Sequence, residues 1–382
     1  MPSSAIPGFS RLSLDEKLKK VAEFANLDHY DLRLMESYRN LPDFTELENN
    51  LGPFKIATNF LVNGRDYLIP MDTEEPSVVA AASRMAKIVR AGGGFEGKYL
   101  DSKMTGQIQL LGVSDFSGAK KAILGAKKDL LKSANETNKF ISGHGGGAKE
   151  IEVRKVETDK GPHLGVYLSV DTLDAMGANV INTMLEAISP KIAELSGGSP
   201  NLKIVSNYAL KRVVSVSCKV PVEKLATGGF SGEYVAERVI MAAAFAKADP
   251  FRAATHNKGA MNGIDAVLLA TGNDFRAVEA GVHAYAARGC KYTAITDYWF
   301  EGGNLCGKIE IPMPVGTVGG ATGLKRSRLA LKVIGVKSAQ ELGVVIASVG
   351  LANNLAAMSA IVSEGIQKGH MRLHNQFVGQ TK

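Results

Sequence analysis

The sequence predicts an α+β protein in which a large, mainly helical domain is interrupted by a small ferredoxin-like domain. Its 382 residues exceed what one ordinary hydrophobic core accommodates, so two or three domains are expected. Between residues 106 and 219 the hydrophobic patterns follow the order β-α-β-β-α-β, which is that of a split-βαβ unit. Because long helical patterns return at 230–288 and 326–370, we expect a discontinuous large domain (1–105 and 220–374) around an inserted small domain (106–219).

The N-terminal part predicts a helix followed by a β-hairpin. Residues 12–47 are polar and carry apolar side chains at helical spacing. Two short alternating segments follow, at 56–62 and 67–70, and Asn63-Gly64 between them is typical of a tight hairpin turn. Pro76 then begins an alanine-rich helix, and a proline disfavours helical geometry in the residue before it. Glu75 is therefore expected at the junction between strand and helix.

The small domain has one predicted element for each part of its βαββαβ order. The expected strands and helices are 107–113 (strand), 119–138 (helix), 151–157 and 163–170 (strands), 175–195 (helix) and 202–206 (strand), with a further strand at 212–220. The turn Lys160-Gly161-Pro162 joins the two middle strands. The chain is expected to return to the large domain through the last strand.

Composition limits the class of protein but does not choose a function. The formal charge of +7 suits an anionic partner such as nucleic acid or a phosphate-rich small molecule, or it is a solvated basic surface. Three cysteines without CxxC spacing argue against a disulfide framework or a zinc site and fit a reducing cytoplasm. No charge-free apolar stretch is expected to reach the length needed to cross a bilayer, and the most apolar segment, 343–362, contains Asn353 and Asn354 and predicts a buried helix.

Two glycine patterns were tested as dinucleotide-binding loops. Gly92, Gly94 and Gly97 match G-x-G-x-x-G, but a helix precedes them, whereas the motif requires a strand before and a helix after. Residues 143–148 nearly match, but a strand follows them. Both sets are interpreted as turn glycines. The segment 174–179 instead opens a helix after a strand, which suits either a phosphate at the helix N-terminus or a well-capped helix.

The densest polar stretch, 252–263, surrounds Lys258 with amides and small residues. We expect this lysine to lie off the freely solvated surface. Asp274 follows a glycine turn and either caps the next helix or pairs with Lys258, which would keep the ammonium group aimed at a carbonyl oxygen. His370 and His374 have i, i+4 spacing without an accompanying glutamate, so a general acid or a surface position is favoured over a metal site.

Together these motifs closely resemble hydroxymethylglutaryl-coenzyme A (HMG-CoA) reductases of the second, soluble class. The resemblance runs from about residue 9 to 374 and rests on several separate motifs in the right order. The matching segments are 74–83, 174–179, 255–259, 270–274 and 369–371. It implies a helical HMG-CoA-binding domain with an inserted ferredoxin-like cofactor domain, in a cytoplasmic enzyme that interconverts HMG-CoA and mevalonate plus coenzyme A using NADH or NADPH and no metal.

The resemblance also implies a catalytic set of four residues. Lys258 would stabilise the oxyanion, Glu75 would protonate the reacting carbonyl oxygen, Asp274 would lie between them, and His370 would protonate the departing thiolate. The implied substrate contacts are Ser77, Asn207, Arg252, Asn262 and Asn353. The implied cofactor contacts are Asn138, Asp174, Met176, Gly177, Asn179, Gly319 and Gly320. Family active sites lie at a dimer interface, so a homodimer or higher homo-oligomer is expected, with neither nucleic acid nor membrane as partner.

Three positions depart from the family pattern. Asn138 stands where an NADH-preferring pattern has an aspartate that would repel a 2′-phosphate, so NADPH is admitted. Asn353 stands where glutamine is expected. Residues 375–382 are interpreted as the start of a C-terminal flap region that is missing or truncated.

Two other classes remain open from the sequence. A basic RNA-binding protein with a ferredoxin-like module would need aromatic residues on its sheet, and the two middle strands offer only Tyr167. A cysteine-dependent acyltransferase would need a histidine beside a cysteine, and neither Cys290 nor Cys306 has one nearby in sequence.

Overall fold

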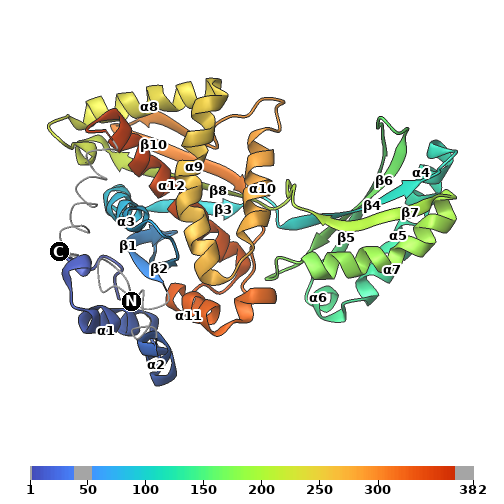
Figure 1. Ribbon diagram of the computed structural model, residues 1–382, viewed down its shortest axis with the longest axis horizontal. Helices are drawn as coiled ribbons and strands as arrows, with labels where there is room; N and C mark the ends of the chain where they lie inside the picture. The colour runs from blue at the N-terminus through green and yellow to red at the C-terminus, as the bar shows by residue number, and fades with distance from the viewer. Residues whose placement is uncertain (1, 38–53, 366–382) are drawn as a thin grey trace.

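The computed structural model describes residues 2–37 and 54–365 and contains two separate β-sheets (Figure 1). One sheet has six strands in the order β2-β1-β3-β8-β10-β9, and the other has four in the order β5-β6-β4-β7. The strands are β1 (Lys55–Val62), β2 (Arg65–Met71), β3 (Phe95–Tyr99), β4 (Lys103–Leu111), β5 (Gly147–Val156), β6 (His163–Asp171), β7 (Ser199–Ser206), β8 (Val213–Pro221), β9 (Thr296–Glu301) and β10 (Asn304–Pro312). The mixed α+β fold predicted from the sequence is therefore confirmed.

The α-helices precede, separate and follow these strands in chain order. They are α1 (Leu14–Ala25), α2 (His29–Ser37), α3 (Pro76–Arg90), α4 (Phe116–Gly125), α5 (Lys127–Glu136), α6 (Lys139–Gly143), α7 (Ala178–Ser196), α8 (Gly232–Ala248), α9 (Pro250–Thr271), α10 (Phe275–Ala286), α11 (Lys325–Ile334) and α12 (Ala339–Val362). The sequence predicted one helix at 12–47, but the described part of this segment forms two helices, α1 and α2. The break occurs because Asn26 adopts a left-handed conformation with φ of 50° and ends α1.

The four-stranded sheet is antiparallel throughout, and its order places β4 between β6 and β7. This is the arrangement of a split-βαβ unit. The inward side chains of β4 alternate with outward ones, and α7 packs closely because Gly106 leaves room for Ile181 and Leu185. The unit has its own hydrophobic cluster, built from residues between Met104 and Ala209.

The six-stranded sheet contains strands that the sequence reading left unassigned. The sequence predicted β1, β2 and β8, but not β3 or the hairpin of β9 and β10. That hairpin turns at Gly302 and Gly303, whose φ values of 56° and 79° match the left-handed turn that two-residue hairpins need. A Gly-Gly pair between two β-rich runs was the signal that could have found it.

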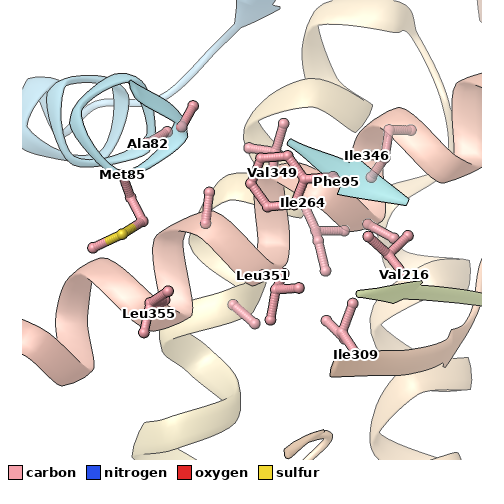
Figure 2. Packing of buried hydrophobic residues seen from close by; sticks show 14 of the residues in the cluster. Ala82, Met85, Phe95, Val216, Ile264, Ile309, Ile346, Val349, Leu351 and Leu355 are labelled. Atoms are coloured by element: carbon pink, nitrogen blue, oxygen red, sulfur yellow. The ribbon is translucent and has the colours of Figure 1, made fainter. Parts of the chain in front are cut away.

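Helix α12 runs through the core of the large part of the molecule. Figure 2 shows Ile346 and Val349 of this helix close to Phe95 and Val216 of the sheet, with Ile264 of α9 beside them. By length and composition α12 could cross a membrane, with a mean hydropathy of 1.7, so the expectation that no stretch reaches that length was wrong. Because 83% of its most apolar window is buried inside the protein, the prediction of a buried core helix at 343–362 is confirmed.

Candidate active site

A pocket of about 510 Å³ gathers six of the residues expected in the substrate site. They come from the start of α3, from one face of α9 and from α12: Glu75, Ser77, Arg252, Lys258, Asn262 and Asn353. Segments separated by more than 170 residues in sequence thus meet at one place. The pocket has the size of small-molecule sites in other proteins.

The start of α3 holds Glu75 as the sequence predicted. Pro76 occupies the first helical position, and Glu75 is the N-cap residue in extended conformation, with φ of −102° and ψ of 103°. The Ser77 hydroxyl donates a hydrogen bond of 2.6 Å to Glu75 Oε1. The carboxyl group is therefore oriented by its own helix before any ligand arrives.

Helix α9 contributes Lys258 to the pocket, and the two residues before it are anchored by hydrogen bonds to residues 292–296. The Nε2 atom of His256 lies 2.5 Å from the Thr296 hydroxyl, and the side-chain amide of Asn257 donates to the Tyr292 hydroxyl and the Thr293 carbonyl. Both His256 and Asn257 are buried. These contacts fix the rotation of α9 about its axis.

The pocket is lined by three cationic side chains and two carboxylates. Arg84, Arg252 and Lys258 line it together with Glu75 and Glu364, and within the described residues none of the three cations forms an ion pair. Arg252 donates to the Met358 sulfur at 3.3 Å, and burial lowers the pKa of its guanidinium. Cations that line a pocket without a directly bound carboxylate favour the binding of a carboxylate or phosphate.

Lys258 is nevertheless exposed in the single chain. The expectation that it lies off the solvated surface was wrong for the single chain, although the lysine does line the pocket. Arg84 on α3 is exposed as well.

Asn353 contributes an unused hydrogen-bond acceptor. Its Nδ2 donates to the Val78 carbonyl at 3.0 Å, while its buried Oδ1 has no partner. Asn353 Oδ1 can occupy this position because Gly263 has no side chain. A Cβ on Gly263 would lie 2.1 Å from Asn353 Oδ1. An unpaired buried acceptor is costly, so a ligand hydroxyl or amide that donates to it would be favoured.

The expected cofactor residues form a second group outside this pocket. The turn between β6 and α7 meets the loop after β10, where Thr317 N–H donates to the Asp174 carbonyl at 2.9 Å and Val318 pairs with Ala175. Gly177 caps α7 with φ of 99°, and a Cβ on it would lie 2.2 Å from Thr172 Cγ2. Only glycine fits this position without strain.

Four more of the expected cofactor residues lie on the same loops. Met176 is half-buried beside the glycine, Asn179 is exposed in the first turn of α7, and Gly319 and Gly320 are exposed with φ of 85° and 58°. Asn138 lies on a different segment, between α5 and α6, where it caps α6 by accepting from Ile141 N–H at 3.1 Å.

Asp274 belongs to this second group and does not pair with Lys258 within one chain. It caps α10 by accepting from Ala277 N–H at 3.2 Å, and Arg276 donates to it at the same distance. Its neighbour Asn273 accepts from Gly316 N–H in the loop after β10. Lys258 lies 13 residues before the end of α9 at Thr271, a separation of roughly 20 Å at 1.5 Å per residue.

Two other expected residues lie away from the pocket. Asn207 is exposed in the turn after β7, where its carbonyl packs against Gly281 of α10. His370, and the expected flap region at 375–382, lie outside the described residues. Figure 1 shows α3 and the four-stranded sheet on opposite sides of α9 and α10, which is why one chain keeps the two groups apart.

Arg84 and His256 are among the pocket residues that the sequence did not predict. Arg84 lies seven residues after Ser77 on α3, a spacing that places both on one helix face. His256 also lines the pocket, and burial lowers its pKa to about 4. Helical spacing could have found the arginine, whereas the burial of the histidine depends on the fold.

Comparison with known proteins gives one consistent answer. The sequence profile of the hydroxymethylglutaryl-coenzyme A reductase family matches residues 16–375. The chain is 49% identical to a 3-hydroxy-3-methylglutaryl-coenzyme A reductase of Archaeoglobus fulgidus (97% of this chain, 86% of that protein) and 34% identical to a probable one of Borreliella burgdorferi (96% and 84%). Its structure is similar to that of the class II enzyme of Streptococcus pneumoniae bound to NADPH, with a TM-score of 0.86 and 40% identity over 94% of this chain and 99% of that one. The chain therefore belongs to the hydroxymethylglutaryl-coenzyme A reductase family.

Proposed function

We propose that the pocket around Lys258 is where HMG-CoA and mevalonate plus coenzyme A are interconverted, the NADPH-dependent reaction of the family to which this chain belongs. The observation that carries the assignment of this pocket is a set of three cations, Arg84, Arg252 and Lys258, that form no ion pair within the described residues and lie in one pocket with the carboxyl group of Glu75. HMG-CoA brings a carboxylate, phosphates and a thioester carbonyl. Family membership leaves the RNA-binding alternative without support.

The residues of the pocket divide the chemistry between them. Lys258 would neutralise negative charge on the carbonyl oxygen, and Glu75, held by Ser77, would supply the proton to that oxygen. Arg252 and Asn262 would bind the HMG carboxylate and hydroxyl, with Asn353 Oδ1 accepting a further hydrogen bond. His370 would protonate the thiolate of coenzyme A. No metal is required, because lysine supplies the positive charge.

The second group of residues fits a dinucleotide. The first turn of α7, opened by Gly177, offers backbone N–H groups to a pyrophosphate, with Asp174, Met176 and Asn179 around it. A Cβ on Gly319 or Gly320 would meet nothing within 4 Å, so this loop leaves open space for a ligand. When bound, each reduced nicotinamide would supply one hydride, so two cofactor molecules would have to bind in turn for a thioester to be reduced to an alcohol.

The two groups must come together between subunits. Within one chain, Lys258 and Asp274 are too far apart to pair, and Lys258 is left exposed. We propose a homodimer or higher homo-oligomer in which the partner subunit's Asp274, Asn207 and cofactor loops complete each pocket. A two-fold interface would do this twice, once for each subunit.

The proposal includes the domain division and the cofactor preference. The large domain (1–105 and 220–374) would bind HMG-CoA, the small domain (106–219) would bind the cofactor, and the enzyme would be cytoplasmic. Asn138 caps α6 without adding a negative charge, which supports acceptance of the 2′-phosphate of NADPH. Steady-state rates with both cofactors decide this point, and a preference of about a hundredfold for NADH would contradict it.

The assay that tests the function follows nicotinamide absorbance with HMG-CoA as substrate. We expect the wild-type protein to oxidise NADPH and Lys258→Ala to lose about 10²-fold or more of kcat, because an oxyanion stabiliser is removed. Lys87→Ala, an exposed lysine on α3 outside the pocket, is the matched control and should retain the wild-type rate. A wild-type protein inactive with both cofactors would refute the assignment.

A further inference from the structure

Arg212 is a fully buried arginine at the passage from the small sheet to the large one. It lies between β7 and β8, is 1% exposed, and forms no ion pair within the part of the chain that the structure describes. Burial lowers the pKa of its guanidinium, and its Nε has no hydrogen-bond partner. A cation in such a position is destabilising unless its remaining donors are well used.

The other two nitrogens of Arg212 bind two different segments. Nη1 donates to the Thr172 hydroxyl at 2.6 Å and to the Ala175 carbonyl at 3.1 Å. Nη2 donates to the Val315 carbonyl at 2.8 Å and to the Leu173 carbonyl at 3.4 Å. The turn between β6 and α7 is thereby tied to the loop after β10.

The surrounding contacts hold the same two segments in register. Met313 N–H donates to the Arg212 carbonyl, and the Asp174 carboxylate accepts from Ala339 N–H in the first turn of α12 at 2.7 Å. A Cβ on Gly316 would lie 2.7 Å from the Met176 backbone nitrogen, so the two backbones are in direct contact. Tyr99 lies close to the guanidinium, and its hydroxyl donates to the Met313 carbonyl.

The two segments that Arg212 joins lead directly into the two halves of the proposed cofactor site. Residues 172–175 precede Gly177 and the first turn of α7, and Val315 precedes the Gly319-Gly320 loop. Replacing the guanidinium would leave the Thr172 hydroxyl and the Leu173 and Val315 carbonyl oxygens without this donor, while the Ala175 carbonyl would keep only the bond from the Thr172 hydroxyl. Since Arg212 is buried, it acts on a ligand only through these backbones.

We propose that Arg212 is a positioning residue that sets the separation between the α7 turn and the 315–320 loop, and thereby the affinity for the nicotinamide cofactor. The inference rests on the proposed function, because it assumes that these two loops hold NADPH. It predicts that loss of the Arg212 hydrogen bonds weakens NADPH binding. The affinity of the pocket for HMG-CoA should be unchanged, because that pocket is built from α3, α9 and α12.

The test compares Arg212→Lys and Arg212→Met with a matched control, Arg90→Met. Arg90 is a partly buried arginine at the end of α3, bound through two nitrogens to Asp66. We expect Arg212→Met to raise the Kd for NADPH, measured by fluorescence titration, about tenfold or more. We expect Arg212→Lys, which keeps the charge but cannot reach all four acceptors, to fall between this variant and wild type. The KM for HMG-CoA should change less than about twofold, and Arg90→Met should change neither constant.

If the wild-type enzyme is active and folded Arg212→Met protein binds NADPH with wild-type affinity, the positioning role of Arg212 is overturned while the proposed function stands. If neither Arg212 variant gives a native circular-dichroism spectrum, Thr172→Val carries the test, because it removes one acceptor of the guanidinium, together with the bond from that hydroxyl to the Ala175 carbonyl, at nearly constant volume. We expect it to weaken NADPH binding about threefold to fivefold, and unchanged affinity in that variant overturns the proposal. A wild-type protein that fails to bind NADPH overturns the proposed function and this inference together.

Discussion

In the pocket around Lys258, three cationic side chains lack an acidic partner within the described residues, whereas around Asp174 the polar side chains are already engaged in hydrogen bonds. Asp174, Asn273 and Asp274 each accept from a backbone N–H group. The first region can therefore bind an anionic ligand through its side chains. In the second region, the side chains hold the backbone in a fixed position, so the backbone itself can contact a ligand. Side-chain deletions should therefore matter most in the pocket, and changes of backbone geometry in the cofactor loops.

Arg252→Met is the sharpest test of the pocket side of this comparison. Because the guanidinium has no acidic partner, its loss should raise the KM for HMG-CoA about 10- to 100-fold. The Tm should stay the same or rise, since a partly buried unpaired cation is removed. Arg154→Met, which removes an exposed arginine paired with Glu152, is the control that should leave KM unchanged. A folded Arg252→Met with wild-type KM would show that the pocket cation has no role in binding.

Gly177→Ala tests the backbone side. The added Cβ would meet Thr172 Cγ2 at 2.2 Å in a residue with φ of 99°, a strain of about 1–3 kcal/mol that shifts the first turn of α7. We expect the KM for NADPH to rise about tenfold with little change in the KM for HMG-CoA. Gly197 lies at the other end of α7, with φ of 65° and open space around it. Gly197→Ala should therefore lower the free energy of unfolding and leave both KM values unchanged. Equal kinetic effects of the two substitutions would contradict the distinction.

His256 gives a smaller effect, on stability. Its pKa is about 4 when folded and about 6.5 when unfolded, so the unfolded chain binds more protons between these values. Lowering the pH from 7 to 5 should therefore destabilise the wild type relative to His256→Gln, by on the order of 2 kcal/mol in urea unfolding. An identical pH dependence of the two proteins would show that His256 is not buried as the neutral form.

Local chemistry explains which features the sequence could predict. Pro76 places Glu75 at the N-cap of α3, and a glycine turn places Asp274 at the N-cap of α10. The apolar run at 343–362 predicted the buried helix α12 although it contains two asparagines. Each depends on neighbours within one or two turns. The strand β3 was missed because its pairing with β1 and β8 is settled by residues far away in sequence.

The relation of Lys258 to Asp274 shows what was harder to foresee. Their sequence motifs lie close together and suggested one ion pair. A continuous α9 from Pro250 to Thr271 separates them, because a helix converts 13 residues into roughly 20 Å. Arg212 was likewise unpredictable, since nothing near it in sequence indicates that it binds the Thr172 and Val315 segments.

The proposed mechanism requires that each active site contain residues of two subunits. Mixing two inactive variants tests this requirement directly. Lys258→Ala and Asp274→Asn, the latter keeping the helix cap, should each be nearly inactive alone. If Lys258 works with the partner subunit's Asp274, an equal mixture refolded together should recover about a quarter of the wild-type rate, because one site in four then carries both native residues. No recovery in a mixture shown to contain hybrid oligomers would mean that both residues act within one chain, and would contradict the account.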